Sequence, residues 1–455
     1  MKKTSLLALL LCLCMLLAAC ATSTSGTPAN EKTTAPSAET SDTTQTAASE
    51  ETSAAETTGE TPLSGDIEVG ILLAEGTAGY ELIVNNVGNW LIERNPDLSI
   101  EYTFANTKAR SFMEQKWRSG DAPDTDYFVF NAQVPSTYEF TDRLLDLKPY
   151  MESDEGWSKY KDSAMSIMEL DGKIYGAITD THVQGLYYNK AYFEQFGINP
   201  PETWEDLLAA CETLKSNGID PIAVTGTYAP YMGAWLDYLM IREVGYDAAY
   251  EAIRNGTLSE LPGVKRAVDK CKQLIDNGYF LQGFEGTDFT AAQMQFFQGK
   301  AGMILMGTWL TSEMADSIPA DFQLGICPFP TVSTGEVEQT QITSHSNVIS
   351  VNKDSENLDA AIAFVKRFTS EEVQTMRAEQ TGLISAVEGV AAPTNVYGLG
   401  DLLDSATSMH VRHFALEFEA DKNTAYYNEV AKLFMGQVSG DEFIANADAV
   451  MSALK

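Results

Sequence analysis

Apolar and polar positions follow two periods along the chain after residue 66. Short apolar runs at 66–73 (DIEVGILL) and 126–130 (DYFVF) have the length and composition of buried strands. The intervening segments 80–93 (YELIVNNVGNWLIE) and 110–124 (RSFMEQKWRSGDAPD) carry apolar side chains at helical spacing. Strands that alternate with helices predict an α/β fold with a parallel sheet.

Loops that follow strands are the first candidate binding segments, because ligands of open α/β sheets collect at the carboxyl ends of the strands. Residues 74–79 (AEGTAG) follow the first predicted strand, and residues 131–135 (NAQVP) follow the third. Glu75, Asn131 and Gln133 lie in these loops, and their polar groups are suited to hydrogen bonds with hydroxyl groups.

In the second half of the chain, individual residues predict where helices begin and end. Thr203 precedes an apolar periodic segment at 204–214 and is predicted to cap a helix there. Three helices are predicted at 233–245, 247–256 and 262–278, and each ends in Gly or Asn-Gly. The stretch after Glu371 is predicted to be mostly helical. Trp309 is unusual, since it comes directly after an apolar run and a Gly-Thr step in 295–309 (QFFQGKAGMILMGTW).

The N-terminus predicts export and attachment to a membrane. Two lysines precede the apolar stretch 6–17, which is too short for a stable membrane span and is typical of a signal peptide at 1–19. The sequence LAAC at 17–20 resembles a bacterial lipobox, so Cys20 is expected to be lipidated; an ordinary secretory signal is the alternative. Residues 20–66, rich in Thr, Ser, Ala and Glu, are then expected to be the lipidated Cys20 and a disordered stalk.

Net charge, cysteines and histidines limit the partners, disulfides and metal sites that are expected. The net charge of −34 argues against nucleic acid or anionic lipid as a partner. Cys211, Cys271 and Cys327 fall on apolar positions and are expected to be buried thiols, with one disulfide left open. His410 and His413 lie three residues apart without an evident further ligand, so neither a metal nor a cofactor is expected.

Four motifs in one order carry a resemblance to a known family. They are 171–207 (DGKIYGAITDTHVQGLYYNKAYFEQFGINPPETWEDL), 296–309 (FFQGKAGMILMGTW), 325–330 (GICPFP) and 344–368 (SHSNVISVNKDSENLDAAIAFVKRF). In this order the chain from about 67 to 455 resembles the family 1 extracellular solute-binding proteins. Those proteins are the capture components of bacterial ABC importers, and many are specific for oligosaccharides.

The resemblance implies a two-lobed periplasmic-binding-protein-like fold with a hinged cleft between the lobes. Lobe 1 would comprise 67–178 plus 326–371, and lobe 2 would comprise 179–325 plus 372–455. The resemblance implies that the solute is a sugar or oligosaccharide and that ABC transporter permease subunits recognise the lobes closed around it. A monomer, attached to the cell membrane only through its lipid and facing the extracytoplasmic side, is expected.

The same resemblance assigns candidate binding residues. Aromatic rings can stack on the apolar faces of sugar rings, and the family places such a ring at the Trp309 position. Tyr231 and Trp235 are further aromatic candidates, and for all three the alternative is a place in the core. Asp180 and His182 are polar candidates at the first crossing between the lobes, with hydrogen bonds to the hinge backbone as the alternative role. His345, just before the predicted strand 347–351, is a further polar candidate.

Two other functions remain open from the sequence. A secreted glycoside hydrolase needs a pair of carboxylates in a cleft, and no recognisable catalytic motif such as Gly-x-Ser-x-Gly or His-Glu-x-x-His is present. We therefore expect no enzymatic activity. A binding protein for a non-carbohydrate solute is the closer alternative, and a cationic solute would suit the acidic composition.

Overall fold

The computed structural model describes residues 62–454, except 72, 74, 105–108, 128–129, 133–134, 162–163, 166–167, 395, 407–408, 412–413 and 415–417. The predicted signal peptide, Cys20 and the predicted stalk as far as residue 61 lie outside the described residues. The first strand begins at Gly65, slightly before the expected end of the stalk.

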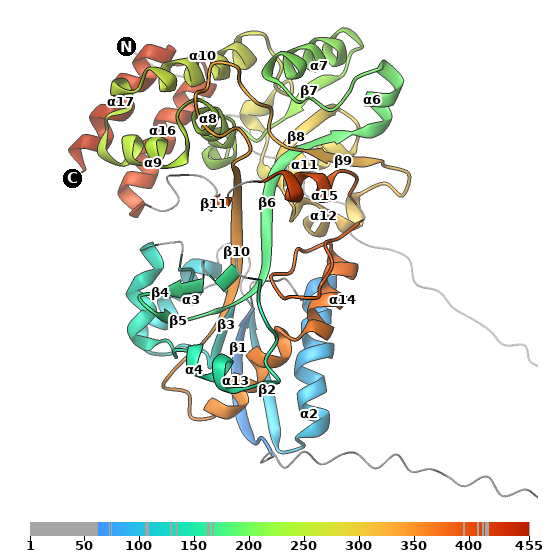
Figure 1. Ribbon diagram of the computed structural model, residues 1–455, viewed down its shortest axis with the longest axis vertical. Helices are drawn as coiled ribbons and strands as arrows, with labels where there is room; N and C mark the ends of the chain where they lie inside the picture. The colour runs from blue at the N-terminus through green and yellow to red at the C-terminus, as the bar shows by residue number, and fades with distance from the viewer. Residues whose placement is uncertain are drawn as a thin grey trace, which may run out of the picture. The chain divides into compact units, whose positions relative to one another are not determined.

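A nine-stranded sheet runs through the folded part of the chain (Figure 1). Its main order is β2-β1-β3-β10-β6-β8-β7, with β11 beside β10 and β9 beside β6. The strands are β1 (Gly65–Ile71), β2 (Leu98–Phe104), β3 (Thr125–Tyr127), β6 (Ala177–Asn189), β7 (Asp220–Ala223), β8 (Ala301–Gly307), β9 (Leu324–Cys327), β10 (Ile342–Val351) and β11 (Met409–Val411); β4 (Glu169–Leu170) and β5 (Lys173–Ile174) form a separate hairpin.

The sheet is mixed, which corrects the prediction of a parallel one. Strands β1, β2 and β3 are parallel, as the alternation of strands and helices predicts, and so are β7 and β8. Strand β6 is antiparallel to β10 and β8, and β10 is antiparallel to β3. The two longest strands, β6 and β10, therefore run in opposite directions through the middle of the sheet and connect its two ends.

Two separate hydrophobic cores lie at the two ends of this sheet. One contains Val69, Trp117 and Phe364, and the other contains Leu186 and Tyr426. We refer to the parts of the chain around them as lobe 1 and lobe 2. Helix α13 packs against β1 and β10 in lobe 1, whereas α7 and α11 pack against β7 and α8 against β8 in lobe 2.

The helices, with short π and 3₁₀ segments, are α1 (Ala78–Ile83), η1 (Val84–Asn89), α2 (Trp90–Arg94), α3 (Ala109–Ser119), η2 (Pro135–Arg143), α4 (Lys148–Ser153), α6 (Lys190–Phe196), α7 (Trp204–Ser216), α8 (Ala229–Val244), α9 (Tyr246–Asn255), η3 (Leu258–Glu260), α10 (Pro262–Asp276), η4 (Phe284–Gly286), α11 (Phe289–Phe297), α12 (Leu310–Glu313), η5 (Ala315–Ser317), α13 (Leu358–Phe368), α14 (Glu371–Thr381), α15 (Leu399–Ser405), α16 (Ala420–Phe434) and α17 (Gly440–Ala453).

Packing at α14 bears on where the chain leaves lobe 1 for the last time. Val373, Ala378 and Val390 belong to the lobe 1 core, although the family resemblance implies a crossing after residue 371. We propose a later crossing, after Val390, because buried apolar side chains move with the core in which they pack.

Local signals in the sequence account for several helix ends. Thr203 caps α7 and forms a reciprocal capping box with Asp206, which confirms the predicted helix start. Gly256 ends α9 in the left-handed conformation, as the Asn-Gly sequence predicts. Cys211, Cys271 and Cys327 are buried free thiols, in agreement with the prediction.

Candidate functional site

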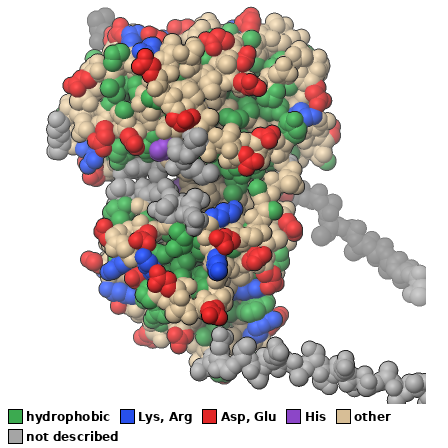
Figure 2. Space-filling view, viewed as in Figure 1, with side chains coloured by type: hydrophobic (Ala, Val, Ile, Leu, Met, Phe, Trp, Pro, Cys, Tyr) green, Lys and Arg blue, Asp and Glu red, His purple; other side chains and the backbone are tan. Residues whose placement is uncertain are grey.

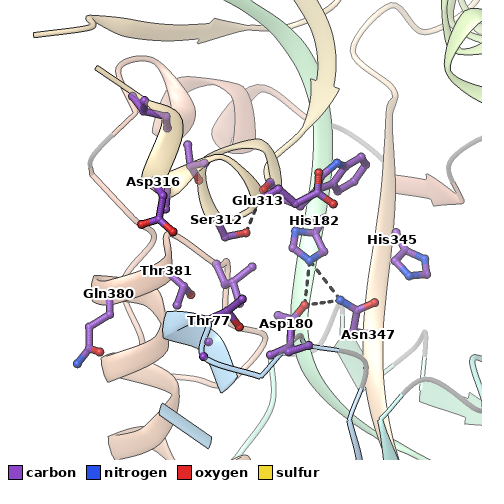
Figure 3. A pocket seen from close by; sticks show the side chains of 18 of the residues that line it. Thr77, Asp180, His182, Ser312, Glu313, Asp316, His345, Asn347, Gln380 and Thr381 are labelled. Atoms are coloured by element: carbon purple, nitrogen blue, oxygen red, sulfur yellow. Dashed lines mark hydrogen bonds and ion pairs between the residues drawn. The ribbon is translucent and has the colours of Figure 1, made fainter. Parts of the chain in front are cut away.

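A cavity of about 880 Å³ lies where lobe 1 and lobe 2 meet. Its volume falls within the range typical of sites for small molecules. The floor is formed by β6 and β10, and the walls come from the loop after β1, the end of α14 and the segment after β8 (Figure 3). The lining residues are Leu73, Glu75, Gly76, Thr77, Gly79, Tyr127, Asp180, His182, Tyr231, Trp309, Thr311, Ser312, Glu313, Ala315, Asp316, Ile318, Phe322, Leu324, His345, Asn347, Gln380, Thr381 and Leu383.

Asp180 is the centre of a buried polar network in the cavity floor. Its Oδ1 accepts hydrogen bonds from the Tyr127 hydroxyl at 2.6 Å and the Thr179 hydroxyl at 2.9 Å. The Arg377 guanidinium forms an ion pair with the same oxygen at 2.8 Å. Oδ2 accepts a 2.6 Å hydrogen bond from the Asn347 amide. The carboxylate therefore has partners in lobe 1, Tyr127 and Arg377, and partners on the connecting strands, Thr179 and Asn347.

This pairing determines the charge state of Asp180. Burial by itself raises the pKa of Asp180, but the Arg377 guanidinium and the hydrogen bonds from His182 and Tyr127 hold that pKa well below its usual range. Arg377 also donates to the Thr179 carbonyl at 2.6 Å, and its guanidinium lies 4.8 Å from the centre of the Phe368 ring. Asp180 and Arg377 thus form a buried ion pair that ties α14 to β6.

His182 connects this network to the aromatic wall of lobe 2. Its Nε2 lies 2.9 Å from Asp180 Oδ2, and its Nδ1 lies 3.4 Å from the Thr308 hydroxyl. Its ring contacts Trp309 edge to face, with ring centres 5.5 Å apart. His182 is directly opposite His345 in the pairing of β6 with β10, so both histidines reach the cavity floor from adjacent strands.

Trp309 and Tyr231 form an aromatic wall on the lobe 2 side. Their rings meet edge to face with centres 6.3 Å apart, and Phe289 packs against Tyr231 at 4.4 Å. Trp309 is the second residue after the end of β8 and directly precedes α12, and its ring folds back over Gly307. A strand end followed by a short helix therefore presents the tryptophan to the cavity while much of its ring packs in the lobe 2 core.

The lobe 1 wall is more polar. Thr77 lies at the N-terminus of α1, whose Tyr80 amide donates to its hydroxyl, and Glu75 lies just before it. Gln380 and Thr381 come from the last turn of α14 (Figure 3). An aromatic wall facing hydroxyl, amide and carboxylate groups suits a solute that has both apolar faces and many hydroxyl groups.

Carboxylates dominate the charged groups of the lining. Asp180 is paired with Arg377, but Glu75 on lobe 1 and Glu313 and Asp316 on lobe 2 also line the cavity. Among the described lining residues none is Lys or Arg. Figure 2 shows acidic side chains spread over the visible face of both lobes, so acidic character is a general feature and is not restricted to the cavity.

Most of the predicted binding residues lie together in this cavity. Glu75, Asp180, His182, Tyr231, Trp309 and His345 all line it, although they come from five different parts of the sequence. Gln133 lies outside the described residues.

Two predicted residues lie elsewhere. Trp235 is fully buried in the lobe 2 core, where its ring meets Phe280 and Phe329 edge to face. It lies one helical turn beyond Tyr231 on α8, and this extra turn carries it from the cavity wall into the core. Asn131 is also buried, and its side-chain amide donates to the Ser346 carbonyl at 2.7 Å. Asn131 thus fixes the backbone of β10 and does not appear in the cavity lining.

Sequence inspection missed Glu313, Asp316, Asn347 and Arg377. Glu313 and Asp316 follow Trp309 in the same segment, so the position after β8 could have singled them out. Arg377 gives no local signal, because its partner Asp180 lies 197 residues earlier in the chain.

Within the described residues, no group of three or more His, Cys, Asp or Glu side chains is arranged to hold a metal ion. None of the described helices has the length and apolar character needed to cross a membrane.

A comparison with protein families matches most of the chain to a known family. Residues 94–397 match the family described as bacterial extracellular solute-binding protein. A multiple sugar-binding protein of Streptococcus mutans is 24% identical over 307 residues, which cover 66% of this chain and 71% of that protein. A probable sugar-binding periplasmic protein of Rhizobium meliloti is 27% identical over 320 residues, covering 66% of this chain and 73% of that protein.

Another relative is matched over a shorter part. An uncharacterised ABC transporter extracellular-binding protein of Pyrococcus horikoshii is 27% identical over 245 residues. This alignment covers 53% of the present chain and spans 56% of that relative's length.

Solved structures with the same fold cover nearly the whole described part. A structure from a study of xylan utilisation by Caldanaerobius polysaccharolyticus superposes with a TM-score of 0.74 at 21% identity, covering 84% of this chain and 99% of that one. A chitin oligosaccharide binding protein superposes with a TM-score of 0.73 at 22% identity, covering 86% and 98%. At this level of identity the likeness establishes the two-lobed fold alone.

Proposed function

Because this chain belongs to the bacterial extracellular solute-binding protein family, we propose that it captures a sugar or oligosaccharide in the cavity between its lobes and delivers it to an ABC importer. The observation that carries the proposal is the aromatic wall of Trp309 and Tyr231, which faces a polar lobe 1 wall across a cavity of about 880 Å³. The printed names of the sugar-binding relatives from Streptococcus and Rhizobium support the same ligand class.

Each wall has a distinct role in the proposed capture. The Trp309 and Tyr231 rings stack on the apolar faces of sugar rings, while Glu75 and His345 accept or donate hydrogen bonds at the hydroxyl rim. The ring nitrogens of His182 face Asp180 and Thr308, so its role is to support the Trp309 ring. A ligand that contacts both walls stabilises the closed arrangement of the lobes over the open one. Permease subunits that distinguish the closed from the open arrangement then respond to whether a ligand is bound in the cavity.

A thermal-shift screen against neutral oligosaccharides tests the proposal. A ligand at 100 times its dissociation constant stabilises the folded state by about 2.7 kcal/mol, which is enough for a clear rise in Tm. Ligand recovered from the protein should be chemically unchanged, because we propose binding without turnover. Release of cleaved sugar would instead support a glycoside hydrolase.

The acidic lining favours a second candidate, a cationic solute without a sugar. Glu75, Glu313 and Asp316 line the cavity, and the described lining residues include no Lys or Arg. Spermidine and a basic dipeptide should be added to the same screen at low and high salt. Binding of these cations that weakens with salt, with no response to any sugar, would support this alternative.

We propose that the mature protein is a monomer attached to the outer side of the cell membrane through lipidated Cys20. The proposal rests on the LAAC sequence and the polar segment that follows it. Metabolic labelling with a fatty-acid analogue should label the wild type and leave Cys20→Ser unlabelled. An unlabelled wild-type protein would contradict the lipid anchor without affecting the proposed ligand.

A further inference from the structure

The aromatic wall continues beyond the cavity to an exposed tyrosine. Tyr228 lies directly before α8, and its ring centre is 5.4 Å from that of Tyr231 and 6.4 Å from that of Phe289. Tyr231 lines the cavity, whereas Tyr228 is not among the described lining residues. Tyr228 therefore extends the wall on the side of Tyr231.

Exposure increases along this row of rings. His182 and Trp309 are 5% and 7% exposed at the floor and wall, Tyr231 is half-buried, and Tyr228 is 45% exposed. Each ring contacts the next, from His182 to Trp309, then Tyr231, then Tyr228. The row consequently leads from the floor of the cavity out to solvent.

The orientation of the outer rings suits an extended ligand. The Tyr228 and Tyr231 rings are inclined by 38° with their centres 5.4 Å apart, and Phe289 contacts both, so the two tyrosines are neighbouring parts of one aromatic cluster. An isolated exposed aromatic residue is common on protein surfaces and needs no function. Tyr228 differs because it is held against a ring that lines the cavity, and such a support lowers the entropy lost when a ligand packs on it.

We propose that Tyr228 forms an outer subsite, and that the ligand is a linear oligosaccharide longer than the cavity, with one sugar ring packed on Tyr228 outside it. This inference rests on the proposed function, since it assumes a carbohydrate in the cavity. A sugar ring that leaves the cavity past Tyr231 meets the Tyr228 ring next. The Tyr228 hydroxyl can also bond to the sugar's hydroxyl groups.

Chain-length dependence of binding tests the outer subsite. Calorimetry should use xylo-, cello- and N-acetylchito-oligosaccharides of one to six units. For the series that binds, affinity should rise by about three- to tenfold when one unit is added beyond those held in the cavity, the size of a modest aromatic contact. Tyr228→Ala should remove this last increment and leave the affinity for the shorter ligand unchanged, whereas Tyr228→Phe should keep most of it.

Tyr397→Ala is the matched control, because Tyr397 is also an exposed lobe 2 tyrosine but packs beside Lys190. It should retain the full dependence on chain length. If sugars bind but affinity does not rise with length, or if Tyr228→Ala weakens short and long ligands equally, the outer subsite is wrong and the proposed function stands. If no sugar binds at all, both proposals fail.

Discussion

At Gly307 the backbone passes directly against the Trp309 ring. A Cβ atom built at Gly307 would lie 1.9 Å from Cζ3 and 2.1 Å from Cη2 of that ring. The absence of a side chain is therefore what allows Trp309 to fold back along the end of β8. His182 and Tyr231 then meet the same ring edge to face, so its orientation is determined by three neighbours.

Gly307→Ala should displace the Trp309 ring without removing it. We expect ligand affinity to fall by at least tenfold, and stability to fall by about 1–3 kcal/mol, as is usual when a packed site is overfilled. Calorimetry and urea unfolding measure the two effects separately. Gly400→Ala is the control, because a Cβ at Gly400 in α15 would meet nothing within 4 Å and should leave ligand affinity unchanged. Normal ligand affinity in Gly307→Ala would contradict a stacking role for Trp309.

Strand β6, strand β10 and helix α14 meet at the Asp180 carboxylate. Asp180 belongs to β6, Asn347 to β10 and Arg377 to α14, and both partners bond to the carboxylate. Strands β6 and β10 connect the two cores through the sheet, and α14 packs in the lobe 1 core. A buried ion pair at this point specifies how the three elements sit together, and its loss leaves an uncompensated charge.

Arg377→Met should lower the free energy of unfolding by about 3–5 kcal/mol, because Asp180 then remains as a buried carboxylate without its cation. Urea denaturation measures the change. Arg254→Met removes an exposed pair with Glu251 and should cost less than about 1 kcal/mol. Adding Asp180→Asn to Arg377→Met should recover part of the loss. A single variant as stable as the wild type would show that the ion pair is not structurally important.

The same carboxylate makes stability depend on pH. The pKa of Asp180 in the folded protein lies well below its usual value of 3.8, so folding favours the ionised form. Its contribution is complete above the unfolded pKa and is lost as pH falls below about 4 towards the folded value. Between pH 7 and pH 3, the wild type should lose more unfolding free energy than Asp180→Asn. Parallel losses in the two proteins would contradict this assignment.

Separate cores allow the two lobes to behave as rigid bodies. Each lobe has its own buried cluster, and β6 and β10 connect them through the sheet. Two compact bodies joined by a few crossing segments are the usual basis of hinge closure around a ligand. The cavity has lining residues from both lobes, so the proposed solute would contact both of them.

Ligand binding should therefore make the protein more compact. Small-angle scattering of the soluble protein, without residues 1–61, should give a smaller radius of gyration when the ligand found in the screen is saturating. Trp309→Ala at the same ligand concentration should show less closure, because fewer molecules are occupied. An unchanged radius of gyration at demonstrated saturation would contradict the hinge, although the ligand assignment would remain.

Local features of the fold follow from the sequence alone. The apolar periods predict most strands and helices, and the Thr203 cap follows from short-range chemistry that any helix start obeys. The position of Glu75 in the loop after β1 predicts that it faces the cleft, and the Gly-Thr-Trp sequence at the end of β8 predicts the same of Trp309. Both residues line the cavity. A residue's neighbours along the chain are enough to make such predictions, but the same reasoning also selects Asn131, which bonds to the β10 backbone and does not line the cavity.

Only the tertiary structure decides which distant residues meet. Asp180 and Arg377 pair across 197 positions, and the antiparallel placement of β6 and β10 depends on how the chain returns between lobes. Tyr231 and Trp235 carry the same local signal on one helix, yet one lines the cavity and the other fills the core. Periodicity specifies the face of a helix that is buried, whereas the depth of each turn beneath the surface is determined by what packs against it.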